Sequence, residues 1–457
     1  MVNRRAATLQ DVYRCFEPKP LLDPAEFEAF YVPALDTARG GQTIDRFRLS
    51  LEEACAGLPF KAFLMGHSGN GKSTELTRLC RDLSGQYVIV RIFNSIDPGS
   101  FKAFDVLASI MFAITEQASK SLQDGGLGYQ IPDELIQNIF RWVSTETVSL
   151  AEVTGKEASA QAAIGLAPDS WWAKLWGLSA QIKGEMKYAA DRKKEIVEYR
   201  LQRLSSLIDL LNQLIDNVRG HANEKQKDIL LIVEEFDRTG MNPELVEELF
   251  VTYANIFQEL RLSFIFTIPV SLGYSELNAR LPITPSMLYD TPVFEQDFNP
   301  HIVGRAALDN LLAARVDPAL IEDRQADRMI IASGGNLRDL FALVRDAAAT
   351  ARLRKASQIG QADVDSSIAM LKRTVKARLA QGASDSVTYE QRVKKLIAIH
   401  GQQPAAEILD PVLLSLLRSR SVQEFNGKGR YAVAPLVVDL LKEQMELTTT
   451  DLGGTPS

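Results

Sequence analysis

A short glycine-rich segment carries the clearest chemical pattern in the chain. Residues 66–74 read Gly-His-Ser-Gly-Asn-Gly-Lys-Ser-Thr and match the G-x-x-x-x-G-K-[ST] phosphate loop in full. Its glycines allow a tight turn in which consecutive N–H groups point at phosphate oxygens where a helix begins. Lys72 is expected to reach the β- and γ-phosphates, and the Ser73 hydroxyl to ligate Mg²⁺. We therefore predict a nucleotide site that is lined by Gly66, His67, Ser68, Gly69, Asn70, Gly71, Lys72, Ser73 and Thr74.

A second chemical feature is an apolar run that ends in carboxylates. Residues 228–237 read Asp-Ile-Leu-Leu-Ile-Val-Glu-Glu-Phe-Asp, which is the pattern of a Walker B strand. A central strand of a parallel sheet is apolar on both faces, and its carboxyl end borders the ligand site. We assign Glu234 to the magnesium shell and Glu235 to the orientation of the attacking water. Glu234 is one methylene longer than the usual Asp, which predicts slow hydrolysis with nucleotide binding retained.

Three polar residues farther along the chain are candidates for contact with the γ-phosphate. Thr267 lies at the end of the apolar run 262–268, where it either senses the phosphate or simply favours a strand. Arg338 lies in the first turns of an amphipathic helix after a glycine turn, from which an arginine can contact the phosphate as part of a separate lid. Arg280 is a further candidate, as an arginine finger acting across a subunit boundary.

Strands and helices must hold these residues in place. Five apolar or β-branched runs predict the strands of a parallel sheet: 61–65, 87–93, the five apolar residues within 228–237, 262–268 and 287–294. Helical spacing at 73–83 supplies the helix after the phosphate loop. From about residue 123 to 227 helical periodicity dominates, which predicts a helical insertion before the Walker B strand.

Composition and charge exclude several classes of protein. The chain has 457 residues, of which 46% are hydrophobic and 24% charged, as in an ordinary soluble protein of two or three domains. No apolar run reaches the roughly 18 residues that span a bilayer, and no signal segment is recognisable, so we expect a cytoplasmic protein without membrane contact. A net charge of −7 offers no cationic field for indiscriminate nucleic-acid binding. The three cysteines and four histidines lack the spacing of a disulfide framework or metal site.

Three segments in this order resemble those of a known family. The phosphate loop, the run Leu-Leu-Ile-Val-Glu-Glu-Phe-Asp-Arg and the run Ser-Gly-Gly-Asn-Leu-Arg-Asp-Leu are similar to segments of AAA+ and STAND-type P-loop ATPases, particularly origin-recognition-like prokaryotic members. The resemblance implies Walker A roles for Lys72 and Ser73 and Walker B roles for Glu234 and Glu235. It also implies that Thr267 is sensor 1 and that Arg338 is sensor 2.

The same resemblance implies a fold and a domain order. We expect an α/β P-loop NTPase (AAA+-like) with a parallel sheet, a helical insertion, a helical lid and a C-terminal winged helix. The expected parts are an N-terminal helical segment (1–59), the ATPase core (60–299), the lid (300–385), the winged helix (386–445) and a disordered tail (446–457). The long insertion at about 123–227 is unlike a minimal core of this family.

The C-terminal pattern leaves the partner of the winged helix open. Arg418 and Arg420 on its second helix, with Lys428 and Arg430 on the wing, are candidates for DNA contact. From residue 390 to 443 there are eight Lys and Arg against six Asp and Glu, which is too even to favour DNA over a protein partner.

Two apolar groups have alternative interpretations. Phe30, Tyr31 and Val32 either line the adenine pocket or pack in the core. Trp171, Trp172 and Trp176, within the insertion, predict either a packed helical hairpin, a surface for a partner or a surface that touches a membrane.

The sequence thus leads to a main hypothesis and two alternatives. The main hypothesis is an ATP-dependent molecular switch in which Mg-ATP binding and hydrolysis change domain arrangement or assembly. Such a switch would serve a prokaryotic DNA transaction, signalling or anti-phage defence, as a homo-oligomer or with a protein bound through the insertion or the winged helix. The alternatives are a nucleotide-bound scaffold with little turnover, which Glu234 favours, and a DNA-binding regulator.

Overall fold

The computed structural model describes most of the chain, with gaps. The described residues are 5–40, 42–55, 57–93, 97–99, 101–139, 141–142, 193–234, 236–237, 240–274, 276–295, 298–380, 387–404, 408–424 and 431–444, with side chains from 204 onward in the helix that begins at 193. Trp171, Trp172 and Trp176, for which three interpretations were left open, lie outside these ranges, as do the wing residues Lys428 and Arg430 and the predicted catalytic residue Glu235.

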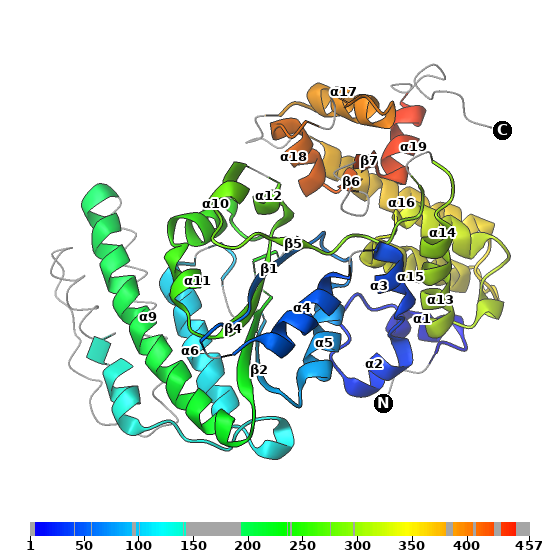
Figure 1. Cartoon of the computed structure of the whole chain (residues 1–457). Coiled ribbons are helices and arrows are strands. Elements are labelled where there is room, and N and C mark those ends of the chain that lie inside the picture. Colours follow the sequence, from blue (N-terminus) through cyan, green and yellow to red (C-terminus); the bar gives the residue numbers. More distant parts are fainter. Residues whose placement is uncertain are drawn as a thin grey trace.

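Five parallel strands form the centre of the molecule (Figure 1). They are β1 (Lys61–Met65), β2 (Tyr87–Ile92), β3 (Asp228–Val233), β4 (Ser263–Ile268) and β5 (Ser286–Met287). Their order in the sheet is β2-β3-β4-β1-β5, so the strand of the phosphate loop lies beside β4, and β3 lies on the far side of β4. The predicted α/β P-loop NTPase fold is therefore confirmed.

The fifth strand is much shorter than predicted. Residues 287–294 were expected to be extended in the sheet, but β5 ends at Met287 after only two paired positions with β1. The Leu288 carbonyl oxygen instead accepts a hydrogen bond from the Asn70 side-chain amide at 2.6 Å, and Asp290 accepts one from Asn336 at 3.2 Å. The Asn70 side chain therefore takes up the carbonyl group of Leu288, whose N–H still donates to the Met65 carbonyl at 2.8 Å.

The alternation of side chains along each strand supplies two apolar faces. One face packs on α6 (Ala103–Ser119), α9 (Lys193–Glu224) and the short helices α10 (Pro243–Glu247) and α11 (Asn255–Glu259), and contains most of the buried phenylalanines. The other face packs on α4 (Thr43–Glu53) and α5 (Lys72–Leu83), as Figure 1 shows. Because both faces are covered, the central strands are mostly apolar, and every residue of β3 from Ile229 to Val233 is buried.

The described part of the predicted insertion is helical. It contains the short turn η1 (Leu122–Asp124), a helical stretch at 133–139 and the 32-residue helix α9. The sheet resumes at β3 directly after α9, as the apolar run beginning at Ile229 predicts.

Four helices pack beside the sheet in the region that was predicted as the lid. They are α13 (Ile302–Arg315), α14 (Gln325–Ser333), α15 (Leu337–Leu353) and α16 (Gln361–Leu379). The first three helices of the chain, α1 (Leu9–Cys15), α2 (Pro24–Phe30) and α3 (Ala34–Arg39), share one buried core with this bundle. The N-terminal segment is thus divided, because α4 packs on the sheet and α1–α3 pack on the later helices.

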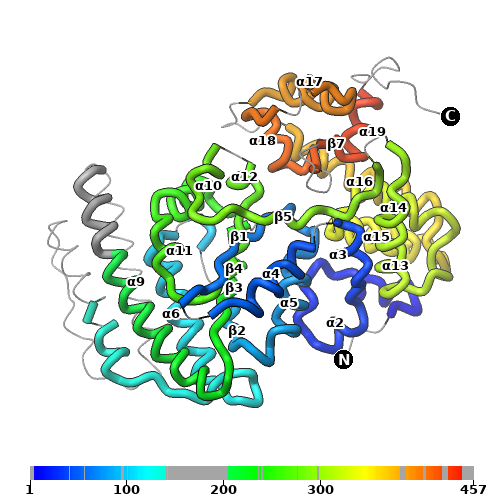
Figure 2. Tube along the Cα trace, in the orientation of Figure 1, coloured from blue at the N-terminus to red at the C-terminus, as the bar shows by residue number. Residues whose placement is uncertain are grey.

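A small module ends the described chain (Figure 2). It consists of α17 (Tyr389–His400), α18 (Pro411–Arg418), the antiparallel pair β6 (Val422–Glu424) and β7 (Tyr431–Val433), and α19 (Pro435–Glu443). These elements occur in the order that was predicted for a winged helix, while the domain bounds remain a prediction. The module contacts α14 and α16 through α19 and has its own apolar core.

The remaining short elements connect these parts. They are η3 (Glu248–Thr252, a π-helical turn), α12 (Val270–Gly273), η4 (Glu276–Arg280) and η5 (Pro318–Leu320). None of the helices in the described ranges is long and apolar enough to cross a membrane.

Candidate nucleotide-binding site

The phosphate loop connects β1 to α5 in a conformation that requires glycine. Gly69 and Gly71 have φ angles of +89° and +98°, in the left-handed region that side chains disfavour. Gly69 also lies against the lid, because a Cβ atom built there would come within 2.5 Å of the Arg338 Cβ atom. The loop is therefore shaped both by its own turn and by the close approach of α15.

Lys72 is buried and fully engaged within the loop. Its ammonium group donates to the Gly66 carbonyl at 2.7 Å and to the His67 carbonyl at 2.9 Å, and it forms an ion pair with Asp237 at 3.0 Å. These oxygens hold the Lys72 ammonium group beside the expected position of the nucleotide phosphates. A bound nucleotide would have to exchange at least some of these contacts for contacts with phosphate.

Glu234 is paired with an arginine that the sequence analysis did not single out. Arg91, on β2, donates from Nε to Glu234 Oε1 at 2.6 Å, from Nη1 to Thr77 Oγ1 at 2.8 Å and from Nη2 to the Ser73 carbonyl at 2.8 Å. Arg91 therefore connects the two residues that were predicted to hold the metal. A basic residue within an apolar strand was the available clue in the sequence.

The surroundings of Ser73 and Glu234 partly suit the binding of magnesium. Glu234 Oε2 is buried and makes no hydrogen bond with any described residue, and Ser73 and Glu234 both line the cavity beside the loop. A buried carboxylate oxygen without a partner suits a magnesium-bound water, and oxygen ligands suit Mg²⁺. Among the described residues no group of three or more His, Cys, Asp or Glu side chains could hold an ion alone, so the phosphates would have to share in binding it. When bound, Mg²⁺ would neutralise phosphate charge.

Asp237 and Thr267 form a further polar contact at the ends of β3 and β4. The Thr267 hydroxyl donates to Asp237 Oδ1 at 2.7 Å, while Asp237 Oδ2 faces Lys72. Asp237 received no separate role in the sequence analysis, although it is the third carboxylate of the cluster after β3. The structure thus brings Thr267 to the loop through a carboxylate.

The first turn of α15 contacts the tip of the phosphate loop through Arg338, whose predicted contact with the γ-phosphate remains a prediction. Its Nη1 donates to Ser68 Oγ at 2.7 Å, and its backbone N–H donates to the Gly69 carbonyl at 3.2 Å. Asn336, which caps α15, donates to the Ser68 carbonyl at 3.0 Å. The lid therefore touches the loop through these three hydrogen bonds.

Arg39 is a second buried arginine that sequence reasoning missed. It is 2% exposed, donates to the Asn70 carbonyl at 2.6 Å and lies 3.6 Å from Glu75. Tyr31 donates to the other oxygen of Glu75 at 3.1 Å. Burial raises the pKa of the Glu75 carboxyl above its ordinary value, and Arg39 opposes this shift. Position 39 directly precedes two glycines, and only this turn pattern hinted at a special role.

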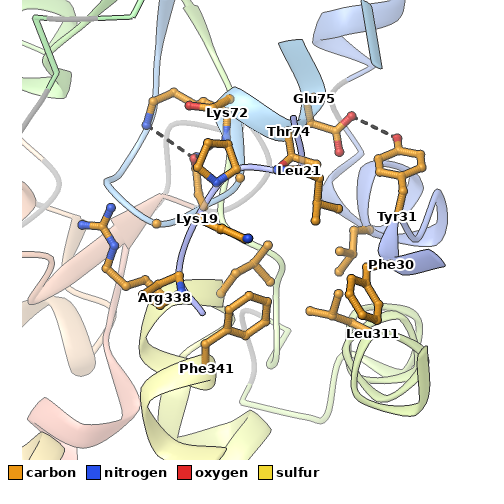
Figure 3. A pocket seen from close by; sticks show the side chains of 18 of the residues that line it. Lys19, Leu21, Phe30, Tyr31, Lys72, Thr74, Glu75, Leu311, Arg338 and Phe341 are labelled. Carbon is orange, nitrogen blue, oxygen red and sulfur yellow. Dashed lines mark hydrogen bonds between the residues drawn. The ribbon is translucent and has the colours of Figure 1, made fainter. Parts of the chain in front are cut away.

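A cavity of about 360 Å³ extends from the loop towards the N-terminal helices and the lid. Figure 3 shows Lys72 and Arg338 at one end of it and Phe30 and Tyr31 at the other. Phe30, Tyr31 and Val32 all line it, so their placement is compatible with the adenine-pocket hypothesis. The buried Arg315 guanidinium also lines it and lies 4.6 Å from the Phe30 ring centroid.

His67 is the one variable loop position with a buried imidazole. It is 5% exposed, and its Nε2 makes no hydrogen bond with a described residue. Burial lowers the pKa of this imidazole below its ordinary value, so His67 is neutral at physiological pH.

Arg420 lies against the phosphate loop, although we had considered it for DNA contact. Its Nη1 donates to the Ser68 carbonyl at 3.2 Å, and its Nη2 lies 3.2 Å from Asp339 of α15. Asp339 is also 3.6 Å from Arg378. A nucleic acid would have to displace these contacts to reach Arg420. Arg418, by contrast, is exposed.

Two further candidate residues, Arg280 and Glu235, are not found in the described site. Arg280 is exposed at the end of η4 and does not line the cavity beside the loop. Glu235 lies outside the described residues, so its role in orienting water remains a prediction.

Comparisons with known proteins identify similar folds only. No protein-family model and no curated protein matches the chain. Among solved structures, the Walker-type ATPase PABY2304 of Pyrococcus abyssi is 14% identical with a TM-score of 0.43, covering 94% of this chain and 99% of that one. The ORC1 protein of Aeropyrum pernix in complex with DNA is 13% identical with a TM-score of 0.39, covering 93% and 96%. The RuvB Holliday junction branch migration motor of Thermotoga maritima is 14% identical with a TM-score of 0.34, covering 94% and 98%. Such distant likenesses establish no family, substrate or partner for this chain.

Proposed function

We propose that the protein is an ATP-dependent molecular switch of the AAA+ or STAND type. Mg-ATP binds between the sheet and the lid, and the occupied loop changes the arrangement of the lid and the C-terminal module, or their assembly with other chains. Hydrolysis returns the switch to its resting state. A prokaryotic DNA transaction, signalling or anti-phage defence is the setting we propose, with a second copy or a partner protein as the recipient.

The observation that carries this proposal is the convergence of three parts of the chain on Ser68. Asn336 and Arg420 donate to its carbonyl oxygen, and Arg338 donates to its hydroxyl. In the described part of the chain, Ser68 of the phosphate loop thus accepts hydrogen bonds from both the lid and the C-terminal module. Any nucleotide-dependent movement of the loop tip alters all three contacts together, which is the physical requirement of a switch.

The cations around the loop, of which Lys72 is buried and Arg338 is exposed, supply contacts that can differ between the two states of such a switch. Lys72 and Arg338 now hold loop oxygens, and both are long enough to exchange these for phosphate oxygens. A ligand shifts a conformational equilibrium only through interactions that differ between the two states. Exchange of the Arg338 contact would release one hydrogen bond between the lid and the loop.

The scaffold alternative gains support from one observation. Glu234 already has a cationic partner in Arg91, at 2.6 Å, and a carboxylate that is neutralised in this way attracts a metal ion less strongly. Slow turnover with tight nucleotide binding would follow.

Turnover and mass measured together test the proposal. We would compare ATP hydrolysis and light-scattering mass for the wild-type protein, Lys72→Ala and Glu235→Gln, with and without DNA. Turnover that Lys72→Ala abolishes, together with ATP-dependent assembly or rearrangement, is the expected result, and Glu235→Gln tests whether Glu235 orients the attacking water. Tight binding without turnover under any condition would leave the scaffold, and absence of ATP binding would refute both.

A further inference from the structure

We propose that Asp237 is a catalytic residue of this site and that Thr267 is its positioning residue. In this assignment Asp237 orients the water that attacks the γ-phosphate, and Thr267 acts through Asp237 rather than by touching phosphate. The inference rests on the proposed function, because it names the groups that perform hydrolysis in the same site.

The geometry around Asp237 places its carboxylate beside the expected phosphates. Its Oδ2 lies 3.0 Å from the Lys72 ammonium, the group expected to reach the β- and γ-phosphates. Its Oδ1 accepts the Thr267 hydroxyl at 2.7 Å. Asp237 also lines the cavity that the loop borders, and its side chain is 15% exposed. The carboxylate is therefore fixed by one neighbour and accessible to a water from the cavity.

Glu234 is less suited to the same task. Arg91 uses Nε, Nη1 and Nη2 to hold Glu234, Thr77 and the Ser73 carbonyl, so the Glu234 carboxylate is neutralised and tied to α5. The side chain of Glu234 is only 3% exposed. Its remaining buried oxygen suits a static role near the metal shell. Asp237 instead has a cationic neighbour that ATP would draw away.

The ion pair with Lys72 divides the proposed role of Asp237 into two stages, before and after the phosphates bind. In this structure Asp237 is the counterion of Lys72, at 3.0 Å. When phosphates attract Lys72, the negative charge of Asp237 is no longer compensated, and the Thr267 hydroxyl keeps one of its oxygens in place. The other oxygen can then accept a hydrogen bond from a water near the γ-phosphate.

Hydrolysis in this site needs no proton carrier other than Asp237 and the solvent. The water oxygen forms a bond to the γ-phosphorus while the bond from that phosphorus to the bridging oxygen of ADP breaks, and ADP leaves with the electron pair. One water proton stays on the new phosphate oxygen. The other passes to Asp237 and then to solvent, which restores the carboxylate.

The test uses the full-length protein and two readouts. Asp237→Asn keeps the shape but removes the charge, so we expect single-turnover hydrolysis of Mg-ATP to fall by about 100-fold. Because the substitution also removes the competing counterion of Lys72, the affinity for ATP, measured by calorimetry, should rise by about threefold or more. A merely structural residue would not produce this gain.

Thr267 supplies the second set of variants. Thr267→Val should lower single-turnover hydrolysis by about 10-fold with ATP affinity unchanged, and Thr267→Ser, which keeps the hydroxyl, should restore it. The double variant of Asp237→Asn with Thr267→Val should be no slower than Asp237→Asn alone, because both act through one carboxylate. Asp323→Asn, at a side chain that is 98% exposed, is the matched control and should leave both readouts unchanged.

Several outcomes would overturn the assignment. If the wild-type protein hydrolyses ATP and the rate of Asp237→Asn is within threefold of the wild-type rate, the assignment is overturned while the proposed function stays intact. If turnover is lost in Glu235→Gln but not in Asp237→Asn, Glu235 is the residue that orients the water. Selective loss of magnesium-dependent ATP affinity in Asp237→Asn would make Asp237 a metal ligand instead. A wild-type protein that neither binds nor hydrolyses ATP would refute the proposed function itself.

Discussion

The aromatic core beneath the sheet and the contacts around the phosphate loop are built from opposite chemistry. Phe250, Phe257 and Phe264 are fully buried, and the Phe250 and Phe257 rings stack with centroids 4.8 Å apart. The loop is instead surrounded by arginine and asparagine side chains that donate to its own oxygens, such as Arg338 and Arg420 to Ser68.

This difference separates stability from switching. Apolar contacts have no substitute in water, so the aromatic core should keep one arrangement in every nucleotide state. Hydrogen bonds to loop oxygens can be exchanged for bonds to phosphate at little net cost. We therefore expect the core to set the free energy of unfolding and the loop contacts to set the arrangement of the lid and the C-terminal module.

Truncation within the aromatic core should have the largest effect on stability. Phe257→Ala should lower the free energy of unfolding by about 3–5 kcal/mol, because it removes a buried ring and leaves a cavity. Urea denaturation measures this change. ATP affinity of the folded protein should stay near wild type. Leu353→Ala, at a side chain that is 86% exposed, serves as the control and should change stability by less than about 0.5 kcal/mol. A mild effect of Phe257→Ala would weaken the comparison.

Removal of the loop cation should have the largest effect on binding. Lys72→Ala should lower ATP affinity by about 100-fold, equivalent to roughly 2.8 kcal/mol, because Lys72 is the buried cation closest to the expected phosphates. Calorimetric titration with Mg-ATP tests this. Lys227→Ala, whose ammonium contacts the distant Ser84 carbonyl, is the control and should bind normally. Equal affinities for the two variants would show that the loop does not bind phosphate as expected.

Loss of the Arg420 contact should have a smaller effect, on the stability of the protein and on the position of its C-terminal module. Arg420→Ala should lower the free energy of unfolding by about 1 kcal/mol and raise the fraction of molecules whose C-terminal module has left the loop. Small-angle scattering of the protein without nucleotide would report the expansion. Arg418→Ala, at the exposed neighbour, should change neither quantity. Identical scattering of the two variants would show that Arg420 does not hold the module in place.

A charged contact remote from the loop should respond to pH but not to nucleotide. Arg354 donates to both oxygens of Asp363 at 2.8 and 2.6 Å, and this pairing lowers the pKa of the Asp363 carboxyl below its ordinary value. The pair therefore stabilises the fold above the unfolded pKa of about 3.9 and loses this effect as pH falls through the folded value.

The corresponding variant isolates this pH-dependent contribution. Asp363→Asn should lose less stability than the wild type when thermal unfolding is followed from pH 7 to pH 3, because one acid-sensitive contact is absent. The difference should be the same with and without ATP. A nucleotide-dependent difference would mean that charged contacts anywhere in the lid respond to the loop, against the proposed division.

Much of the fold could be predicted from local patterns. The phosphate loop, the apolar strand before the carboxylates and the helical insertion all have periodicity or motif spacing that a short window of sequence contains. The length of β5 could not be read in this way, because it depends on Asn70, which takes the Leu288 carbonyl oxygen from a distant part of the chain.

The site was predicted in outline but not in its pairings. Lys72, Ser68 and Arg338 all line one cavity, while their roles towards a nucleotide remain predictions; Arg91 contacts Glu234 and Arg420 contacts Ser68 across 143 and 352 positions of sequence. The residues next to an arginine in the sequence do not indicate which carboxylate or carbonyl group its side chain will contact. Such pairings are set by the packing of whole elements, and they determine which carboxylate remains available for chemistry.

The most direct measurement is the distance between the core and the C-terminal module with and without nucleotide. Spin labels on the exposed Cys55 and on Lys394→Cys of α17, in a chain with Cys15 and Cys80 replaced by alanine, would report it by pulsed electron resonance. We predict that saturating Mg-ATP shifts the distance distribution and that Lys72→Ala abolishes the shift. The same distribution with and without bound ATP would contradict the claim that the phosphate loop controls the arrangement of the domains.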